Sequence, residues 1–118
     1  MFTGYLSNED YDATMRRAGV VLALTTRDHT MQRAGYESLM WGTPVVTSDF
    51  GLLRDYFGSA ALYSDCTATD IRDQIVAAFE RNSELRANAA RVLEERIFEQ
   101  DREIDSVRRV IAQPTGAA

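Results

Sequence analysis

Residues 24–49, LTTRDHTMQRAGYESLMWGTPVVTSD, decide the fold class of this chain. The apolar run at residues 20–24 that leads into them is typical of a parallel strand covered on both faces. Apolar and small residues at helical spacing predict a helix over residues 31–41, which Gly42 ends. The β-branched run at residues 44–48 predicts a second buried strand. The stretch is therefore expected to form a β-α-β unit.

The segments on either side of this unit extend the alternation of strands and helices. Residues 2–5 are typical of a strand end, and residues 60–63 of a short fourth strand. Apolar stripes with helical spacing predict further helices, at residues 7–18, 52–57, 68–80 and 82–97. We therefore expect an α/β fold, a parallel sheet of about four strands with helices on both faces.

The polar run at residues 99–103 falls where two apolar positions of the preceding helix should be. We interpret it as a kink or an exit point before a last helix. The chain is then one domain over residues 1–112, in which residues 101–112 form a terminal helix that packs on a partner domain. Residues 113–118 are expected to be a frayed tail.

The composition excludes several classes of protein. The 118 residues carry a net charge of −5, and all 13 basic residues are arginines without a basic stripe, which argues against a nucleic-acid partner. No run approaches the roughly 18 apolar residues of a membrane-spanning helix. One cysteine, Cys66, cannot form an internal disulfide, which favours a reducing, cytoplasmic location.

Polar loops follow three of the predicted strands, at residues 25–30, 49–53 and 64–67. Carboxyl ends of parallel strands meet at one edge of the sheet, and ligands bind there. The first loop leads into a helix N-terminus, where unpaired N–H groups favour phosphate. Thr30 and Glu37 are expected to share one face of that helix, about 10 Å apart along its axis. No cluster of metal-ligand residues is found, and no metal is expected.

The segment Glu37, Gly42-Thr43-Pro44-Val45-Val46 and Ser48-Asp49 resembles the signature of retaining glycosyltransferases with the GT-B fold. This is the large family, glycosyl transferases group 1, that includes sucrose synthases and bacterial mannosyltransferases. The resemblance extends from residue 2 to about residue 97. It implies a Rossmann-like half of the GT-B fold, a nucleotide-sugar donor, transfer with retention of configuration, and no metal.

The family's motif has two glutamates, eight positions apart, across the loop and the helix. Glu37 corresponds to the second glutamate, which implies that it holds the ribose hydroxyls. His29 stands at the position of the first and becomes a candidate catalytic, sugar-contacting residue; its alternative is a loop histidine paired with Asp28. The resemblance places the donor-binding residues at His29, Thr30, Met31, Gln32, Arg33 and Glu37.

Two functions remain open at this stage. The first is the donor-binding part of a retaining glycosyltransferase, inactive without an acceptor domain or partner subunit. The alternative is a non-catalytic α/β interaction module derived from the same fold; an epimerase of that fold is a third. Expected partners are a nucleotide sugar, the acceptor-binding domain or subunit, and a second copy of the chain.

Overall fold

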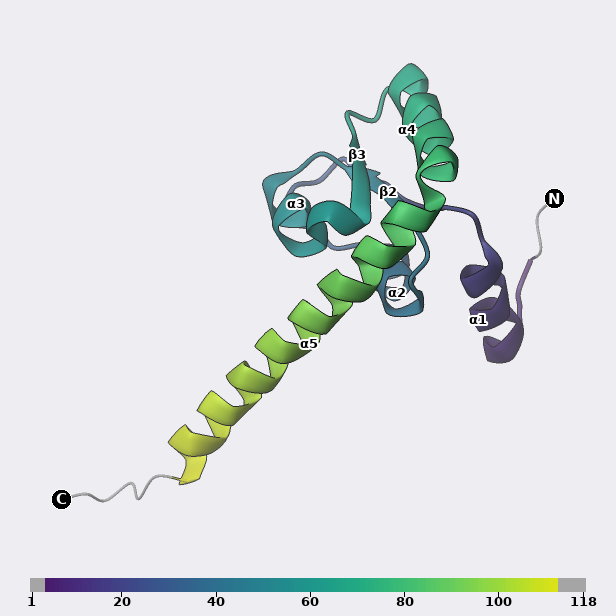
Figure 1. Cartoon of the computed structure of the whole chain (residues 1–118). Helices are drawn as coiled ribbons and strands as arrows, with labels where there is room; N and C mark the ends of the chain where they lie inside the picture. Colours follow the sequence, from purple (N-terminus) through teal and green to yellow (C-terminus); the bar gives the residue numbers. More distant parts are fainter. Residues whose placement is uncertain (1–3, 113–118) are drawn as a thin grey trace.

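The computed structural model of this chain describes residues 4–112. Its elements, in chain order, are α1 (Asn8–Arg17), β1 (Val21–Ala23), α2 (Arg33–Trp41), β2 (Val45–Ser48), α3 (Gly51–Phe57), the 3-10 helix η1 (Gly58–Ala60), β3 (Ala61–Ser64), α4 (Ala68–Glu80) and α5 (Asn82–Ala112). The strands pair in parallel, in the order β1-β2-β3. Figure 1 shows α5 running past the sheet and away from it.

The α/β class and the parallel sheet are confirmed, but the described residues hold three strands rather than four. The additional strand was expected at residues 2–5. Gly4 has a φ of 67°, which is incompatible with a strand, and Tyr5 lies outside any strand. Residues 2 and 3 lie outside the described residues, as does the tail predicted at 113–118.

Helices cover both faces of the sheet. On one face, Ala23, Val45 and Ala61 pack against side chains from α2, α3 and α5. On the other, Val46 and Leu62 pack against α4 and against Leu85 at the start of α5. The apolar runs predicted as buried strands therefore lie between two layers, as parallel strands require.

The edge strand β1 is less completely covered. Leu22, its middle residue, is 46% exposed, whereas its register partner Val46 on β2 is 0% exposed. Among the described residues, β1 has β2 as its strand neighbour on one side and none on the other. The second face of the sheet is therefore closed over β2 and β3 and open over β1.

The start of α2 differs from the prediction. The helix begins at Arg33 rather than at residue 31, because Gln32 has an extended backbone, with φ −73° and ψ 132°. Thr30 therefore lies in the loop, and the expectation that it shares a helix face with Glu37 about 10 Å away is wrong. The predicted end is confirmed: Gly42 is left-handed with φ 69°, and the Thr43 N–H donates to the Ser38 carbonyl over 2.9 Å.

The predicted kink at residues 99–103 is also wrong, because α5 is one continuous helix of 31 residues, about 46 Å long. The run Glu99-Gln100-Asp101-Arg102-Glu103 contains neither glycine nor proline, so nothing in it breaks a helix. The expectation of an exit point fits better, since every residue from 97 to 112 is exposed. Ile97, the last residue of the helix predicted over residues 82–97, is 50% exposed.

The outward extension of α5 dominates the dimensions of the molecule. The radius of gyration is 17.6 Å, against about 13 Å for a compact domain of some 100 residues. We call residues 82–96 the inner half of α5 and residues 97–112 the outer half. The inner half contributes buried residues to the core, whereas every residue of the outer half is exposed.

Candidate functional site

The carboxyl ends of the three strands are tied together by polar side chains. The Ser48 hydroxyl, at the end of β2, accepts from the Thr25 N–H over 2.7 Å and donates to the Thr25 carbonyl over 2.6 Å. The same hydroxyl lies 3.2 Å from the Cys66 sulfur, which follows β3. The loops after β1 and β3 are thus fixed to the end of β2, at the edge where ligands of parallel sheets bind.

An open hollow of about 560 Å³ lies beside this junction. Two predicted donor-binding residues, Thr30 and Gln32, contribute to its wall. The remaining wall comes from the loop after β1, from Cys66 and from α4, through Leu24, Thr25, Thr26, Arg27, Cys66 and Ile71. The hollow is therefore mainly lined by hydroxyl, amide and apolar groups, with one arginine.

The N-terminus of α2 faces the same loop and lacks a side-chain cap. Gln32 occupies the cap position, but its amide donates to the Leu24 carbonyl over 3.3 Å instead of capping the helix. By contrast, the Ser7 and Thr67 hydroxyls cap α1 and α4. The first N–H groups of α2 are therefore not occupied by a capping side chain, and a helix N-terminus in this condition favours an anion.

Glu37 lies one turn further along α2 and joins it to α1. Its Oε2 accepts a hydrogen bond from the Tyr11 hydroxyl at 2.7 Å, and its Oε1 accepts from the Arg33 Nε at 2.5 Å. Only 13% of the Glu37 side chain is exposed, whereas the Arg33 side chain is 90% exposed. Tyr11 also packs edge-on against Trp41, with ring centroids 5.9 Å apart. Glu37 thus has a structural role that its sequence context did not predict.

These partners keep the Glu37 carboxylate ionised. The hydrogen bond from Tyr11, and then that from Arg33, lower the pKa of Glu37 below its ordinary value of 4.5. The same bond to Glu37 raises the pKa of Tyr11 above 10.0, so the phenol stays a donor at neutral pH. A carboxylate has about four lone-pair sites, and two are in use, so Glu37 can still accept from two further donors.

Glu37 and Arg33 line a second hollow of about 460 Å³, between α2 and the segment that contains α1. Gly4, Tyr5, Leu6, Asn8 and Tyr11 form the rest of its wall. Thr30 and Gln32 line the first hollow, and Glu37 lines the second. The predicted donor-binding residues therefore lie on two sides of the α2 N-terminus rather than in one cavity.

His29 is at the tip of the loop and lines neither hollow. Its backbone is left-handed, with φ 58°, and its N–H donates to the Asp28 carboxylate over 2.7 Å. The imidazole Nε2 is 3.8 Å from Asp28 Oδ2, and the side chain is 82% exposed. The pairing with Asp28 expected as the alternative is present, while a contact between His29 and a sugar stays a prediction.

Met31 differs from the other predicted residues, because its side chain is partly buried against the core formed by α2, α3 and α5. Its main hydrogen-bonding groups are therefore those of its backbone. Conversely, neither Tyr11 nor Ser48 was predicted to be a site residue. Tyr11 lies in the helix predicted over residues 7–18 from its apolar stripe, whereas α1 has no buried residue. The position of Ser48 at the end of a buried strand was the available signal.

Within residues 4–112, no three His, Cys, Asp or Glu side chains are grouped as metal ligands. No helix of that part of the chain is long and apolar enough to cross a membrane. Comparison of the chain with protein-family models, with curated proteins and with solved structures found no match in any of the three. The resemblance to retaining glycosyltransferases therefore stays a prediction that rests on the quoted residues.

Proposed function

We propose that this chain is the nucleotide-sugar-binding part of a retaining glycosyltransferase, built on a Rossmann-like half of the GT-B fold. The observation that carries the proposal is the pairing of two features on α2. Its N-terminus has no capping side chain, and Glu37, one turn away, is an ionised carboxylate with unused lone pairs. Arg33 and Glu37 are four residues apart, which separates them by about 6 Å along the axis.

That spacing suits a nucleoside diphosphate. The diphosphate would lie at the first turn of α2, held by N–H groups, by the helix dipole and by the exposed Arg33. The Glu37 carboxylate would accept from the ribose hydroxyls while it keeps Tyr11 and Arg33. The sugar would extend toward the loop at residues 25–30, where Thr30 and Gln32 line a hollow and His29 is exposed.

The proposal needs no metal, because the α2 N-terminus and Arg33 meet the diphosphate charge. It also implies that the chain alone transfers no sugar, because the reaction centre of this fold lies between a donor and an acceptor domain. A cytoplasmic location belongs to the same proposal, on the basis of the single cysteine. Turnover of any nucleotide sugar by the purified chain would contradict it.

Calorimetry with uridine, guanosine and adenosine diphosphates tests the binding site. Glu37→Gln should weaken binding by about five- to thirtyfold, roughly 1–2 kcal/mol, because an amide oxygen accepts more weakly than a carboxylate. Tyr11→Phe is the control for structure, since it removes the hydrogen bond from α1 to Glu37 and leaves the carboxylate, and it should bind within about twofold of wild type. Glu84→Gln, which removes another arginine-paired carboxylate, should have no effect.

His29→Ala separates the sugar end from the nucleotide end. It should leave diphosphate binding unchanged and weaken only the binding of the nucleotide sugar. If Glu37→Gln binds the diphosphate as wild type does, the ribose assignment is wrong.

The non-catalytic interaction module is the second candidate, favoured by the exposed apolar side chains of the outer half of α5. A wild-type chain that binds none of the three diphosphates would make it the better reading.

A further inference from the structure

The outer half of α5 carries apolar residues that the core of this chain does not use. Ile97, Ile104 and Ile111 recur at seven-residue intervals, and Val107 lies between the last two. Their exposed fractions are 50%, 40%, 77% and 57%, respectively. A seven-residue apolar repeat on one helix is the pattern of a left-handed coiled-coil seam.

The heptad positions follow directly from this repeat. The isoleucines occupy position a, and position d is filled by Leu93, Gln100 and Val107. The polar run at residues 99–103 thus continues the repeat, with Gln100 as its one polar seam residue. β-branched residues at a are common in two-stranded parallel coiled coils, and a polar residue in the seam fixes the register.

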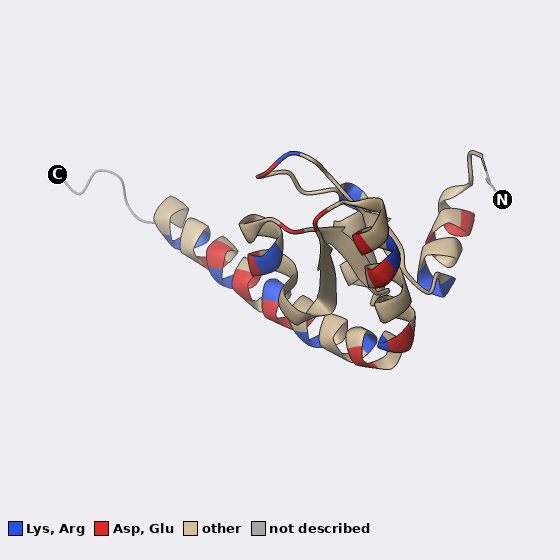
Figure 2. Cartoon of the chain, turned by 90° about the horizontal axis from the view of Figure 1, so that it is seen from above, with Lys and Arg blue, Asp and Glu red and all other residues tan. Residues whose placement is uncertain are grey.

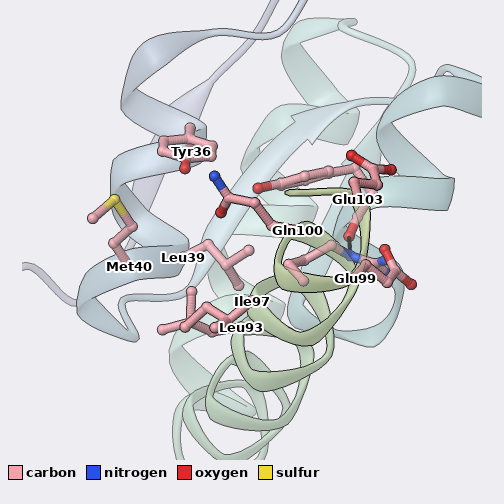
Figure 3. Close-up of a pocket in the computed structure, with 10 residues that line it drawn as sticks. Tyr36, Leu39, Met40, Leu93, Ile97, Glu99, Gln100 and Glu103 are labelled. Carbon is pink, nitrogen blue, oxygen red and sulfur yellow. Dashed lines mark hydrogen bonds and ion pairs between the residues drawn. The ribbon is translucent and has the colours of Figure 1, made fainter. Parts of the chain in front are cut away.

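The seam begins where α5 leaves the core. Figure 3 shows Ile97 and Gln100 of α5 opposite Tyr36 and Met40 of α2, across a hollow of about 430 Å³. Tyr36 and Met40 are 44% and 53% exposed. Exposed apolar side chains of α2 therefore lie beside the start of the stripe on the outer half of α5.

The charges beside the seam show which partner fits it. Glu103 is at position g and Arg108 at position e of the next heptad, and in a parallel pair these two positions meet across the interface. Glu103 of one chain would thus face Arg108 of a second copy, twice by symmetry. Neither side chain has an ion-pair partner in residues 4–112, where both are exposed. Figure 2 shows the two signs of charge interspersed along α5.

An antiparallel arrangement centred near residue 102 is unfavourable. It would place Glu103 opposite Glu103 of the second copy, and Asp101 opposite Asp101 of the second copy. Like charges at these flanking positions oppose association. The parallel arrangement avoids both contacts and also sets Asp101 against the Arg96 position, although Arg96 already bonds the Tyr56 carbonyl and Glu99.

We propose that the outer half of α5 binds a second copy of this chain as a parallel, in-register, two-stranded coiled coil over residues 97–111. The two bodies then lie at the same end of the coil. This interaction goes beyond the proposed nucleotide-sugar function and does not depend on it, because no predicted donor-binding residue takes part.

Sedimentation equilibrium of the 118-residue chain tests the association. The mass should approach twice the 13.2 kDa of the chain as concentration rises. Ile104→Asp should raise the dissociation constant at least tenfold. Phe98→Asp is the matched control, because Phe98 is more exposed, at 63%, but lies outside the seam. A monomer at all concentrations, or equal losses in both variants, would overturn the proposal.

Charge reversal tests the orientation. Glu103→Arg alone and Arg108→Glu alone should each weaken self-association, because each sets like charges against one another. An equimolar mixture of the two variants should form a heterodimer at least as well as wild type forms its homodimer. If the mixture stays as weakly associated as the separate variants, the parallel pairing is wrong. Circular dichroism on each variant verifies that α5 remains helical.

Discussion

The two halves of α5 are parts of one helix with opposite surroundings. In the inner half, Leu85, Ala89 and Val92 are 0%, 1% and 3% exposed and close the core on the sheet. In the outer half, Ile104 and Ile111 are 40% and 77% exposed and belong to neither core cluster. Apolar residues at helical spacing therefore identify a helix, but they do not say whether its partner surface belongs to the same chain.

The largest expected effect would come from the inner half. Leu85→Ala removes a fully buried side chain from the contact with Val46, Leu62 and Ala78. It should reduce the free energy of unfolding by about 3 kcal/mol at every protein concentration. Ile104→Ala should lower stability only where the chain is self-associated. Urea unfolding, followed by circular dichroism at two protein concentrations, distinguishes the two variants. If both variants lost the same free energy of unfolding in dilute solution, the contrast between the two halves would be wrong.

A smaller effect is expected from an arginine of the inner half. The Arg86 guanidinium donates to the Ala18 carbonyl over 3.0 Å and to the Asn82 side chain over 2.8 Å. Arg86→Ala should cost about 2 kcal/mol, because half-buried acceptors lose a charged donor. Arg109→Ala, in the exposed outer half, should change the free energy of unfolding by no more than about 0.5 kcal/mol. Thermal unfolding of the two variants measures the difference between their losses of stability. Equal losses would show that the Arg86 hydrogen bonds do not stabilise the fold.

The contact between α1 and α2 should respond to acid, unlike the apolar contacts of α5. The folded-state pKa of Glu37 is depressed, first by Tyr11 and then by Arg33. Its contribution is therefore present above the ordinary pKa of 4.5 and is lost as pH falls through the depressed value. The emission of Trp41, the one tryptophan, should report this through its contact with Tyr11.

Glu37→Gln is the comparison for that titration. This variant should lack the acid-dependent change in Trp41 emission. Its helical circular dichroism should be the same as that of wild type. A variant that shows the wild-type change would assign it to another carboxylate.

The smallest effect is expected at Phe98. Its ring is 63% exposed and contacts the Arg102 guanidinium, 5.9 Å from the ring centroid. Phe98→Ser should change the free energy of unfolding by no more than about 0.5 kcal/mol, in the dimer as in the monomer. A larger cost in chemical denaturation would show that the outer half packs on something through the face opposite the seam.

The β-α-β unit was predictable because its signals are local. Buried β-branched runs, a glycine past the helix and polar loops each act within a few residues. The sequence did not reveal that α2 starts two residues late, because Gln32 bonds the Leu24 carbonyl, eight positions away, instead of entering the helix. The polar run at residues 99–103 led to the prediction of a kink, but polar residues end the burial of a helix without ending the helix itself.

The candidate site was predictable only in part. The loop and helix that carry it were located correctly, but the environment of Glu37 depends on Tyr11, which is 26 positions away. No periodicity connects a residue on α1 with one on α2. The result is a glutamate that joins two helices, a role that neither motif nor spacing indicates.

The strand order β1-β2-β3 also bears on how the chain folds. The register partners Val21 and Val45 are 24 positions apart, and Val45 and Ala61 are 16 apart. Loop-closure entropy grows only with the logarithm of this separation, so the two pairings differ by about 0.4 kcal/mol. Neither strand pair therefore has a large entropic advantage over the other. The sheet can nucleate on β2 and grow toward either edge.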